Sequence, residues 1–516
     1  MIVIGAGPNG LFAAARLARA GRKVLVLEAN GRPGGALWSL STTKPGFVHD
    51  VGAGFVCFHD TPAFQGLQLG ARGLRWAHGT YDSAHPATDG TCAAVARDLD
   101  RSAATFGPDA DTWRELVNFH RRIEPHVLEF LGPFPQLAPA LAMGPRDGFR
   151  LLRAFLRSSG RWARRTFQTE AARRVLPAMG LHVDVGPQDR FGVPLCWMLA
   201  MRATTAGYAV PVGGAASISR ALVADLQAHG GQVRTSARVA RVLVRNDRAA
   251  GVALEGGEEL SARAVVADTA APSLFLDLLE PGRVSRRIVR AMRRFPQGWG
   301  TFKLDLALNG PVPWSSEVAR SAAVVHVGDS VDELAGFTRD VRRGSLPMTR
   351  PYLVVGQHSL VDATRAPPGA HTLYVYTHVP SQLDAYRYPG GWLAWRERLA
   401  DAVVDRISDL APGFAARVTE RAIHDPSDLE KMDANLVGGD LGGGSNAWTR
   451  QLVFRPVFPW FRYRTPVAGL YLGSSYAHPG AGIHGMCGWN AAGMVLEDLE
   501  APAAEGVARP EPATTG

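Results

Sequence analysis

The sequence predicts an α/β fold organised around a parallel sheet that binds a dinucleotide, with a second, α+β domain inserted into it. The chain opens on a β-branched run at residues 2–4, followed by the glycine pattern GAGPNG and a helical stretch at residues 11–20. A second apolar run at residues 23–27 ends in an acid, Glu28. Further α/β segments appear in the middle and near the end of the chain. Short buried runs that alternate with helices are typical of parallel sheets.

The opening glycines have separate roles in this motif. Gly5 permits a tight turn, Gly7 close approach to a pyrophosphate, and Gly10 close contact between helix and strand. The helix then directs its unpaired N–H groups at the phosphates, and Glu28 is placed to hold ribose hydroxyls. The alternative is a glycine-rich turn in an ordinary α/β unit. The residues expected to contact the dinucleotide here are Gly5, Gly7, Pro8, Gly10, Glu28 and Ala29.

Composition narrows the classes of function. The chain has 516 residues and a net charge of +9, carried almost entirely by arginine. It has no zinc-finger spacing or aromatic-interleaved basic patch, which argues against nucleic-acid binding. Four scattered cysteines without a CxxC pair favour a reducing cytoplasm. The first strand begins at residue 2 and no run of about 18 apolar residues occurs, so we expect neither a signal peptide nor a spanning helix.

A family resemblance follows from the next motifs. GRPGGALWSL, residues 31–40, places the pair Gly34-Gly35 a few residues after Glu28, and a hydrophobic DVGA segment comes next. This order resembles the phytoene-desaturase-like flavoprotein family of the amine-oxidase superfamily. The resemblance implies that the dinucleotide is FAD and that the GG segment contacts its ribityl-diphosphate region. The implied contact residues are Gly34, Gly35, Ala36, Leu37, Gly52 and Ala53.

The middle and the end of the chain resemble later parts of the same domain. The strand near Val239 corresponds to one that supplies backbone bonds to adenine. Near the end, a strand at residues 467–473 precedes a glycine-rich loop at 480–488 and a helix at 489–499. In such flavoproteins this helix directs its N-terminus at the pyrimidine end of the isoalloxazine. The implied contact residues are Val239, Gly473, Ser474, Gly485 and Met486.

We therefore expect a Rossmann-like FAD-binding domain of GR2 type, assembled from discontinuous segments. Its segments are residues 1–85, 205–290 and 455–500. An α+β substrate domain takes residues 86–204 and 291–454, and residues 501–516 form a disordered tail rich in Ala, Pro, Glu and Thr. In the substrate domain the patterns predict helices at 111–131, 146–165, 169–179, 392–410 and 412–418, and strands at 301–308, 323–327, 352–359 and 371–379.

The sequence pattern at residues 146–165 predicts a basic amphipathic helix. We expect its apolar residues to pack on the domain, because arginines surround it. The alternative is that it lies on an anionic bilayer, as members of the resembled family that handle carotenoids do. Its apolar residues are Phe149, Leu152, Phe155, Leu156 and Trp162.

Four side chains are candidates for catalysis. His484 and His478 bracket the glycine loop beside the expected flavin ring, and His182 and Asp184 lie where the resembled family brings its substrate domain to the flavin. Each also has a structural alternative, such as bonding a backbone carbonyl. We expect His49 and Asp50 to pin their strand. The aromatic set, expected either to line an apolar cavity or to pack in the core, is Trp448, Phe454, Phe458, Trp460 and Phe461.

The resemblance implies an FAD-dependent oxidoreductase that desaturates or oxidises a hydrophobic polyene, isoprenoid or secondary-metabolite molecule. Hydride passes to the flavin, and O2 or a quinone reoxidises it. Alternatives are a flavin-dependent polyene isomerase, an amine oxidase and a non-catalytic prenyl-lipid carrier of the GDP-dissociation-inhibitor type. No metal site is expected. Homo-oligomerisation and membrane contact of a cytoplasmic protein stay open.

Overall fold

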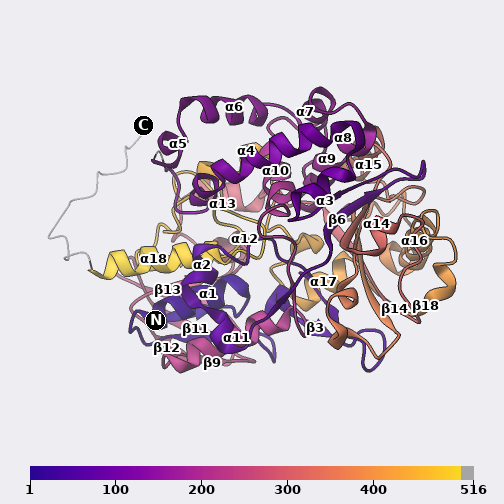
Figure 1. Ribbon diagram of the computed structural model, residues 1–516. Coiled ribbons are helices and arrows are strands. Elements are labelled where there is room, and N and C mark those ends of the chain that lie inside the picture. Colours follow the sequence, from indigo (N-terminus) through magenta and orange to yellow (C-terminus); the bar gives the residue numbers. More distant parts are fainter. Residues whose placement is uncertain (137, 501–516) are drawn as a thin grey trace.

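The computed structural model describes residues 1–136 and 138–500 (Figure 1), so the expected tail at 501–516 lies outside the described residues. Its first sheet has five parallel strands in the order β19-β13-β1-β2-β9. Val3 at the centre lies opposite Val26 and Val266. The strands are β1 (Ile2–Ile4), β2 (Leu25–Leu27), β9 (Gln232–Arg234), β13 (Val265–Ala267) and β19 (Leu470–Leu472). The beginning, middle and end of the chain therefore meet in one sheet, as the sequence predicts.

Three helices pack around this sheet. They are α1 (Pro8–Arg19), α11 (Ala216–Ala228) and α18 (Met486–Glu500), and α1 contacts both of the others. The contact between α1 and α18 is close, because a Cβ added to Gly488 would lie 1.8 Å from the carbonyl oxygen of Asn9. An antiparallel ribbon joins this domain; its strands are β10 (Val239–Arg245), β11 (Arg248–Leu254) and β12 (Glu259–Ser261).

A second sheet of seven strands, seen at the right of Figure 1, has the order β18-β14-β17-β16-β15-β6-β7. Only the pair β15–β6 is parallel. The strands are β6 (Tyr81–Pro86), β7 (Cys92–Val95), β14 (Gly300–Leu308), β15 (Ala322–Val327), β16 (Leu353–Gly356), β17 (His371–Val379) and β18 (Val418–His424). The helix expected at 412–418 is wrong, since a single 3-10 turn at Ala415–Arg417 leads into β18.

Helices cover the upper part of this second body in Figure 1. The first group is α3 (Leu99–Ala104), α4 (Ala110–Glu129), α5 (Ala138–Ala142), α6 (Pro145–Phe155), α7 (Ser159–Thr166), α8 (Glu170–Arg173), α9 (Val175–Gly180) and α10 (Val193–Arg202). Later helices are α15 (Val331–Arg342) and α16 (Gly391–Ser408). The single helix expected at 146–165 is two helices, because Ser158 caps α7 by accepting a hydrogen bond from the Arg161 N–H.

The expected apolar face of that stretch is also wrong in part. The buried side chains of the stretch are Leu151, Ala154, Ser159, Trp162 and Ala163. Phe149 is 61% exposed, and Leu152 and Leu156 are 52% and 55% exposed. The surface of α6 therefore combines apolar side chains with exposed arginines.

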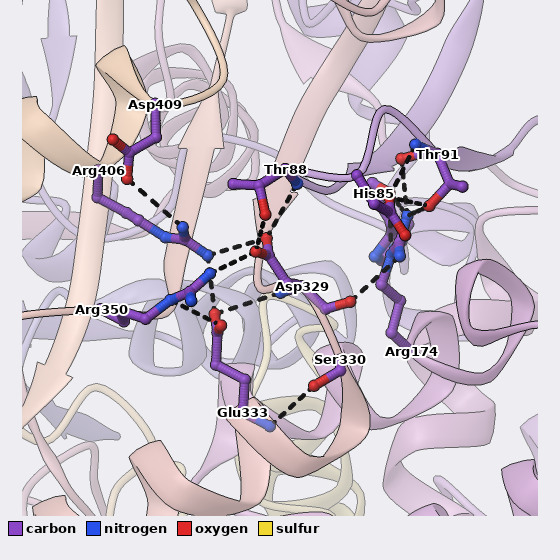
Figure 2. A network of polar contacts seen from close by, with 11 residues as sticks. His85, Thr88, Thr91, Arg174, Asp329, Ser330, Glu333, Arg350, Arg406 and Asp409 are labelled. Atoms are coloured by element: carbon purple, nitrogen blue, oxygen red, sulfur yellow. Dashed lines mark hydrogen bonds and ion pairs between the residues drawn. The ribbon is translucent and has the colours of Figure 1, made fainter.

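A polar network ties sequence-distant parts of the second body together (Figure 2). Asp329 accepts hydrogen bonds from Thr88 and from the guanidinium groups of Arg350 and Arg406. The buried Arg174 donates to the carbonyl oxygens of Asp329 and of residue 85, and to Thr91. The β6–β7 hairpin is thereby joined to the turn before α15 and to α16.

The domain boundaries stay predictions, with one revision that we propose. Tyr81–Pro86 pairs with β15 of the second sheet, although the expected boundary at residue 85 assigns it to the first domain. We place this boundary near residue 80.

Candidate cofactor and active site

A cavity of about 260 Å³ lies at the carboxyl ends of β1, β2 and β13, which is where α/β sheets bind ligands. Six of the residues expected to contact the dinucleotide line it. They are Gly5, Gly7, Glu28, Ala29, Gly35 and Val239. Residues 431–435 close the cavity from the inserted part of the chain.

Glu28 is buried in the wall of this cavity with both carboxylate oxygens engaged. Oε2 accepts a hydrogen bond from the Ala6 N–H at 2.7 Å, and Oε1 accepts one from the Asn30 N–H at 2.8 Å. The acid therefore fastens the glycine loop to the end of β2. Pro8 takes the first position of α1, where its missing N–H costs nothing.

Asp268, directly after β13, is a residue that the sequence analysis missed. Its Oδ2 accepts a hydrogen bond from the Gly10 N–H at 2.7 Å, and a Cβ added to Gly7 would lie 2.7 Å from the same oxygen. Burial, with Asp433 and Glu28 nearby, raises the pKa of Asp268 to about 8. Near pH 7 the neutral carboxyl group adds no charge at the N-terminus of α1. The acid after the buried run AVVA was the available signal.

The GG segment lies over the opening loop. The Gly34 N–H donates to the Ala6 carbonyl at 2.8 Å, and a Cβ added to Gly35 would lie 3.2 Å from the Cα of Gly7. The two implied contact segments meet, because the Ala53 N–H donates to the Ala36 carbonyl at 3.1 Å. Leu37 is buried beside them, and a Cβ at Gly52 would lie 2.7 Å from the Ala36 oxygen.

The C-terminal glycine loop lies against the opening helix. Gly473 donates its N–H to the Ala267 carbonyl at 2.9 Å, and Ser474 follows as a buried residue. A Cβ added to Gly485 would lie 2.7 Å from the ring of Phe12 on α1. Met486 begins α18. The terminal loop and the opening glycine loop therefore belong to one site region.

Two of the candidate catalytic histidines form hydrogen bonds with backbone groups. His484 accepts a hydrogen bond at Nδ1 from the Met486 N–H at 3.0 Å, so it caps the start of α18. Burial lowers the pKa of His484 to about 4. His478 donates from Nε2 to the carbonyl oxygen of Phe130 at 2.9 Å, just after α4. A catalytic role for either ring stays a prediction.

His182 and Asp184 have different surroundings although only Val183 separates them in the sequence. The carboxylate of Asp184 accepts hydrogen bonds from the Ser445 hydroxyl at 3.0 Å and the Asn446 N–H at 2.9 Å. Burial, with Asp440 nearby, raises the pKa of Asp184 to about 7. The ring of His182 instead contacts Tyr376 and His326.

A buried charged cluster on β14 is a second feature that the sequence analysis missed. Lys303 and Asp305 form an ion pair with no exposed side-chain surface. His424 lies 3.2 Å from the Asp305 carboxylate, and the Thr42 hydroxyl donates a hydrogen bond to the same carboxylate at 2.8 Å. Burial opposes ionisation, but Lys303 and His424 hold the pKa of Asp305 well below its ordinary value.

Asp50 pins its strand, as expected. Its carboxylate accepts hydrogen bonds from the Ser39 hydroxyl at 2.6 Å, the Ala215 N–H at 2.8 Å and Arg365 at 2.7 Å. His49 contacts the Thr43 hydroxyl at 2.9 Å.

The aromatic set near residues 448–461 is divided: Trp460 packs against the core of the first domain, as expected, whereas three of its rings are exposed. Trp448, Phe454 and Phe458 are about half exposed, and Phe458 stacks on Phe461 at 6.1 Å. Within the described residues no cluster of His, Cys, Asp and Glu suits a metal ion. In the same part of the chain, no helix has the length and apolarity needed to cross a membrane.

The parallel sheet, glycine loop, buried terminal acid and cavity define a dinucleotide-binding α/β protein. The chain is 27% identical to "Pyridine nucleotide-disulfide oxidoreductase domain-containing protein 2" of Rattus norvegicus, over 97% of this chain and 93% of that protein. It is 25% identical to the lycopene-forming phytoene desaturase of Pseudescherichia vulneris, over 97% and 99% of the two chains. The fold matches that of an oxidoreductase from Methanosarcina mazei with a TM-score of 0.64 and 17% identity, over 96% and 99% of the chains.

Residues 9–492 match the family described as flavin containing amine oxidoreductase, and the chain belongs to that family. It is an FAD-dependent oxidoreductase of the amine-oxidase superfamily. The non-catalytic carrier is therefore set aside. The residues present fit the cofactor: Gly7 and Gly35 have close neighbours where a Cβ would stand, and the buried Asn9 at the start of α1 leaves its Oδ1 unpaired.

Proposed function

We propose that this enzyme desaturates or oxidises a hydrophobic small molecule of polyene, isoprenoid or secondary-metabolite type. The observation that carries the proposal is the aromatic surrounding of Phe55, which follows the Gly52–Ala53 segment. Its ring centroid lies 5.3 Å from that of Tyr208 and 6.4 Å from that of Tyr374. The hydroxyl of Tyr374 donates to the Gly52 carbonyl at 2.7 Å, so the second sheet meets the cofactor domain through aromatic rings. Sites of this character suit apolar ligands.

The chain's own residues have three tasks in this mechanism. The opening glycines and the first turn of α1 would bind the diphosphate of FAD, and Glu28 would orient its adenine ribose. His484 fixes the first turn of α18, whose N-terminus would favour negative charge on a reduced flavin held beside it. FAD supplies the hydride acceptor, and O2 or a quinone takes the electrons onward. Buried aromatic rings exclude water from the junction.

The test is an anaerobic reduction assay on the purified holoenzyme. Phytoene in phosphatidylcholine vesicles and putrescine in buffer are mixed separately with the yellow protein, and the visible flavin band is followed. We expect phytoene or a related apolar polyene to bleach the band and to lose two hydrogen atoms by mass spectrometry. Bleaching by putrescine alone would instead identify an amine oxidase.

Product mass and cofactor content give the remaining outcomes. A product of unchanged mass would identify the polyene isomerase. The variant Glu28→Ala is the cofactor control, because we expect it to lower flavin content without altering the substrate domain. Retention of full flavin content by that variant would contradict the assignment of Glu28.

A further inference from the structure

The buried Tyr376 and His326 and the partly buried His182, from distant segments, form a continuous hydrogen-bonded chain beside the aromatic junction. The hydroxyl oxygen of Tyr376 on β17 lies 2.6 Å from Nδ1 of His182. Nε2 of His182 lies 2.6 Å from Nε2 of His326 on β15. Positions 182 and 376 are 194 residues apart, and 182 and 326 are 144 apart.

The contact between the two imidazoles limits which atoms of the hydrogen-bonded chain carry protons. Two ring nitrogens at 2.6 Å need one proton between them, since each can be either donor or acceptor. When His182 donates from Nε2, its Nδ1 accepts the proton of the Tyr376 hydroxyl. When His326 donates, His182 donates from Nδ1 and the Tyr376 hydroxyl proton is free for another acceptor. Passing from the first arrangement to the second moves two protons along these hydrogen bonds, and in addition the Tyr376 oxygen takes up one proton while Nδ1 of His326 gives one up.

Burial keeps both imidazoles neutral at rest. Burial, with His326 and His378 nearby, holds the pKa of His182 well below its ordinary value, and burial with His85 nearby does the same for His326. No carboxylate takes part in the chain. Because both pKa values are lowered, an imidazolium on either ring is short-lived, and a proton taken up by the chain is readily given up again.

The two ends of the chain face different surroundings. At one end Tyr376 follows Tyr374 on the same face of β17, and Tyr374 reaches the Gly52 carbonyl. His182 also contacts Phe55 edge-on at 5.9 Å. At the other end the Nδ1 of His326 has no hydrogen-bond partner among the described residues, although the side chain is 1% exposed. His85 stacks on His326 at 4.7 Å and closes this end.

We propose that Tyr376, His182 and His326 form a proton relay that takes the substrate proton when hydride leaves to FAD. The proposal rests on the proposed function and names the groups that handle its proton. The substrate X–H bond breaks and an O–H bond forms on Tyr376, while the former hydroxyl proton passes to Nδ1 of His182. The Nε2 proton of His182 passes to Nε2 of His326, which becomes an imidazolium. The two-electron acceptor later takes up one proton with each hydride equivalent, so atoms and charge balance.

The first experiment reads the hydrogen bonds without turnover. Proton NMR of holoenzyme labelled with 15N-histidine should show a far-downfield proton between two ring nitrogens, and the variants His326→Phe and His182→Phe should each lose it. His85→Phe is the control, because it keeps the stacked ring and should retain the resonance. Absence of this resonance from a folded, yellow wild-type protein would overturn the relay while leaving the proposed function intact.

The second experiment measures flavin reduction by the polyene that bleaches the enzyme. Tyr376→Phe should slow reduction by roughly 100-fold with little change in KM. His326→Gln, which keeps an amide in place of the ring, should slow it by about tenfold and abolish the solvent deuterium isotope effect. Unchanged rate and isotope effect in both variants would reject the relay. If no polyene reduces the flavin at all, the proposed function fails, and the NMR result alone decides whether the hydrogen-bonded chain exists.

Discussion

Asp268 shows how a single buried acid can shape a phosphate site. It caps the start of α1 by accepting the Gly10 N–H, and it lies among other acids, Glu28 and Asp433. A carboxylate there would repel a diphosphate, whereas a neutral carboxyl group can donate a hydrogen bond to one. The raised pKa therefore makes the site more suitable for an anionic ligand.

The substitution Asp268→Asn tests this description through stability. The pKa of Asp268 is 3.8 in the unfolded chain and about 8 in the folded one, so the folded state binds more protons between these pH values. The contribution of protonated Asp268 to the free energy of unfolding is complete below pH 3.8. It falls as pH rises toward 8, by at most about 1.4 kcal/mol per pH unit. We expect Asp268→Asn to flatten this decline and to raise the melting temperature at pH 8. Thermal unfolding of the wild-type and Asp268→Asn apoproteins from pH 5 to 9 measures this pH dependence. Parallel curves of melting temperature against pH would contradict the raised pKa of Asp268.

Among the elements, α6 departs most from what its sequence pattern indicates. The arginines that surround it favoured packing on the domain, yet Phe149 and Leu152, with Leu156 directly after the helix, all lie at the surface. Apolar side chains beside exposed Arg146 and Arg153 suit the boundary of an anionic bilayer. We therefore propose that α6 is a peripheral membrane contact, through which an apolar substrate would enter.

A vesicle sedimentation assay tests this role of α6. We expect the wild-type protein to bind vesicles that contain phosphatidylglycerol, with binding that weakens as salt rises. Replacing Phe149, Leu152 and Leu156 by serine should reduce binding at least tenfold, because each buried apolar side chain contributes roughly 1.5–3 kcal/mol. Leu393→Ser on α16, where the leucine is 88% exposed, is the matched control. Equal losses in both variants would mean that exposed apolar area in general, rather than α6, causes the binding.

The elements that sequence patterns predicted are those with strong local signals. The strands at residues 2–4 and 265–267 are continuous β-branched or apolar runs in a buried sheet. β18 reads VTERAIH, a half-exposed strand at the sheet edge, and β6 ends in proline. Neither gives the apolar run of a central strand, and each is defined by a partner far along the chain. Periodicity cannot report such pairing.

At the scale of the whole molecule the expected cofactor region was predictable from the sequence, whereas the proposed proton relay was not. The glycine loop, Glu28 and the GG pair follow one another within 35 residues, so their common site is encoded locally. Tyr376 and His326 reach His182 only through the folding of the second sheet. His182 was singled out from its position in a resemblance, but its partners have no spacing that a sequence reveals.

The Asp329 network gives the whole molecule a measurable dependence on long-range ion pairs (Figure 2). Arg406 is almost fully buried and donates to Asp329 at 3.0 Å and to Glu333 at 2.7 Å, so loss of one acid leaves a buried cation less well paired. We expect Asp329→Asn to lower the free energy of unfolding by about 1–3 kcal/mol, since Arg350 is partly exposed. Burial opposes its ionisation, but Thr88, Arg406 and Arg350 together lower the pKa of Asp329 below 3.8.

The lowered pKa of Asp329 determines how the stability lost in Asp329→Asn depends on pH. The stabilisation by Asp329 is complete above the ordinary carboxyl pKa of 3.8 and disappears as pH falls through the lowered value. Urea unfolding of Asp329→Asn should therefore differ from wild type at pH 7 and converge with it in acid. Asp409→Asn is the control, because Asp409 is 59% exposed and lies 3.6 Å from Arg406, and its substitution should cost less than about 0.5 kcal/mol. If the two variants unfold alike at pH 7, the network does not join the β6–β7 hairpin to α16 energetically, and the second body is held by its apolar core alone.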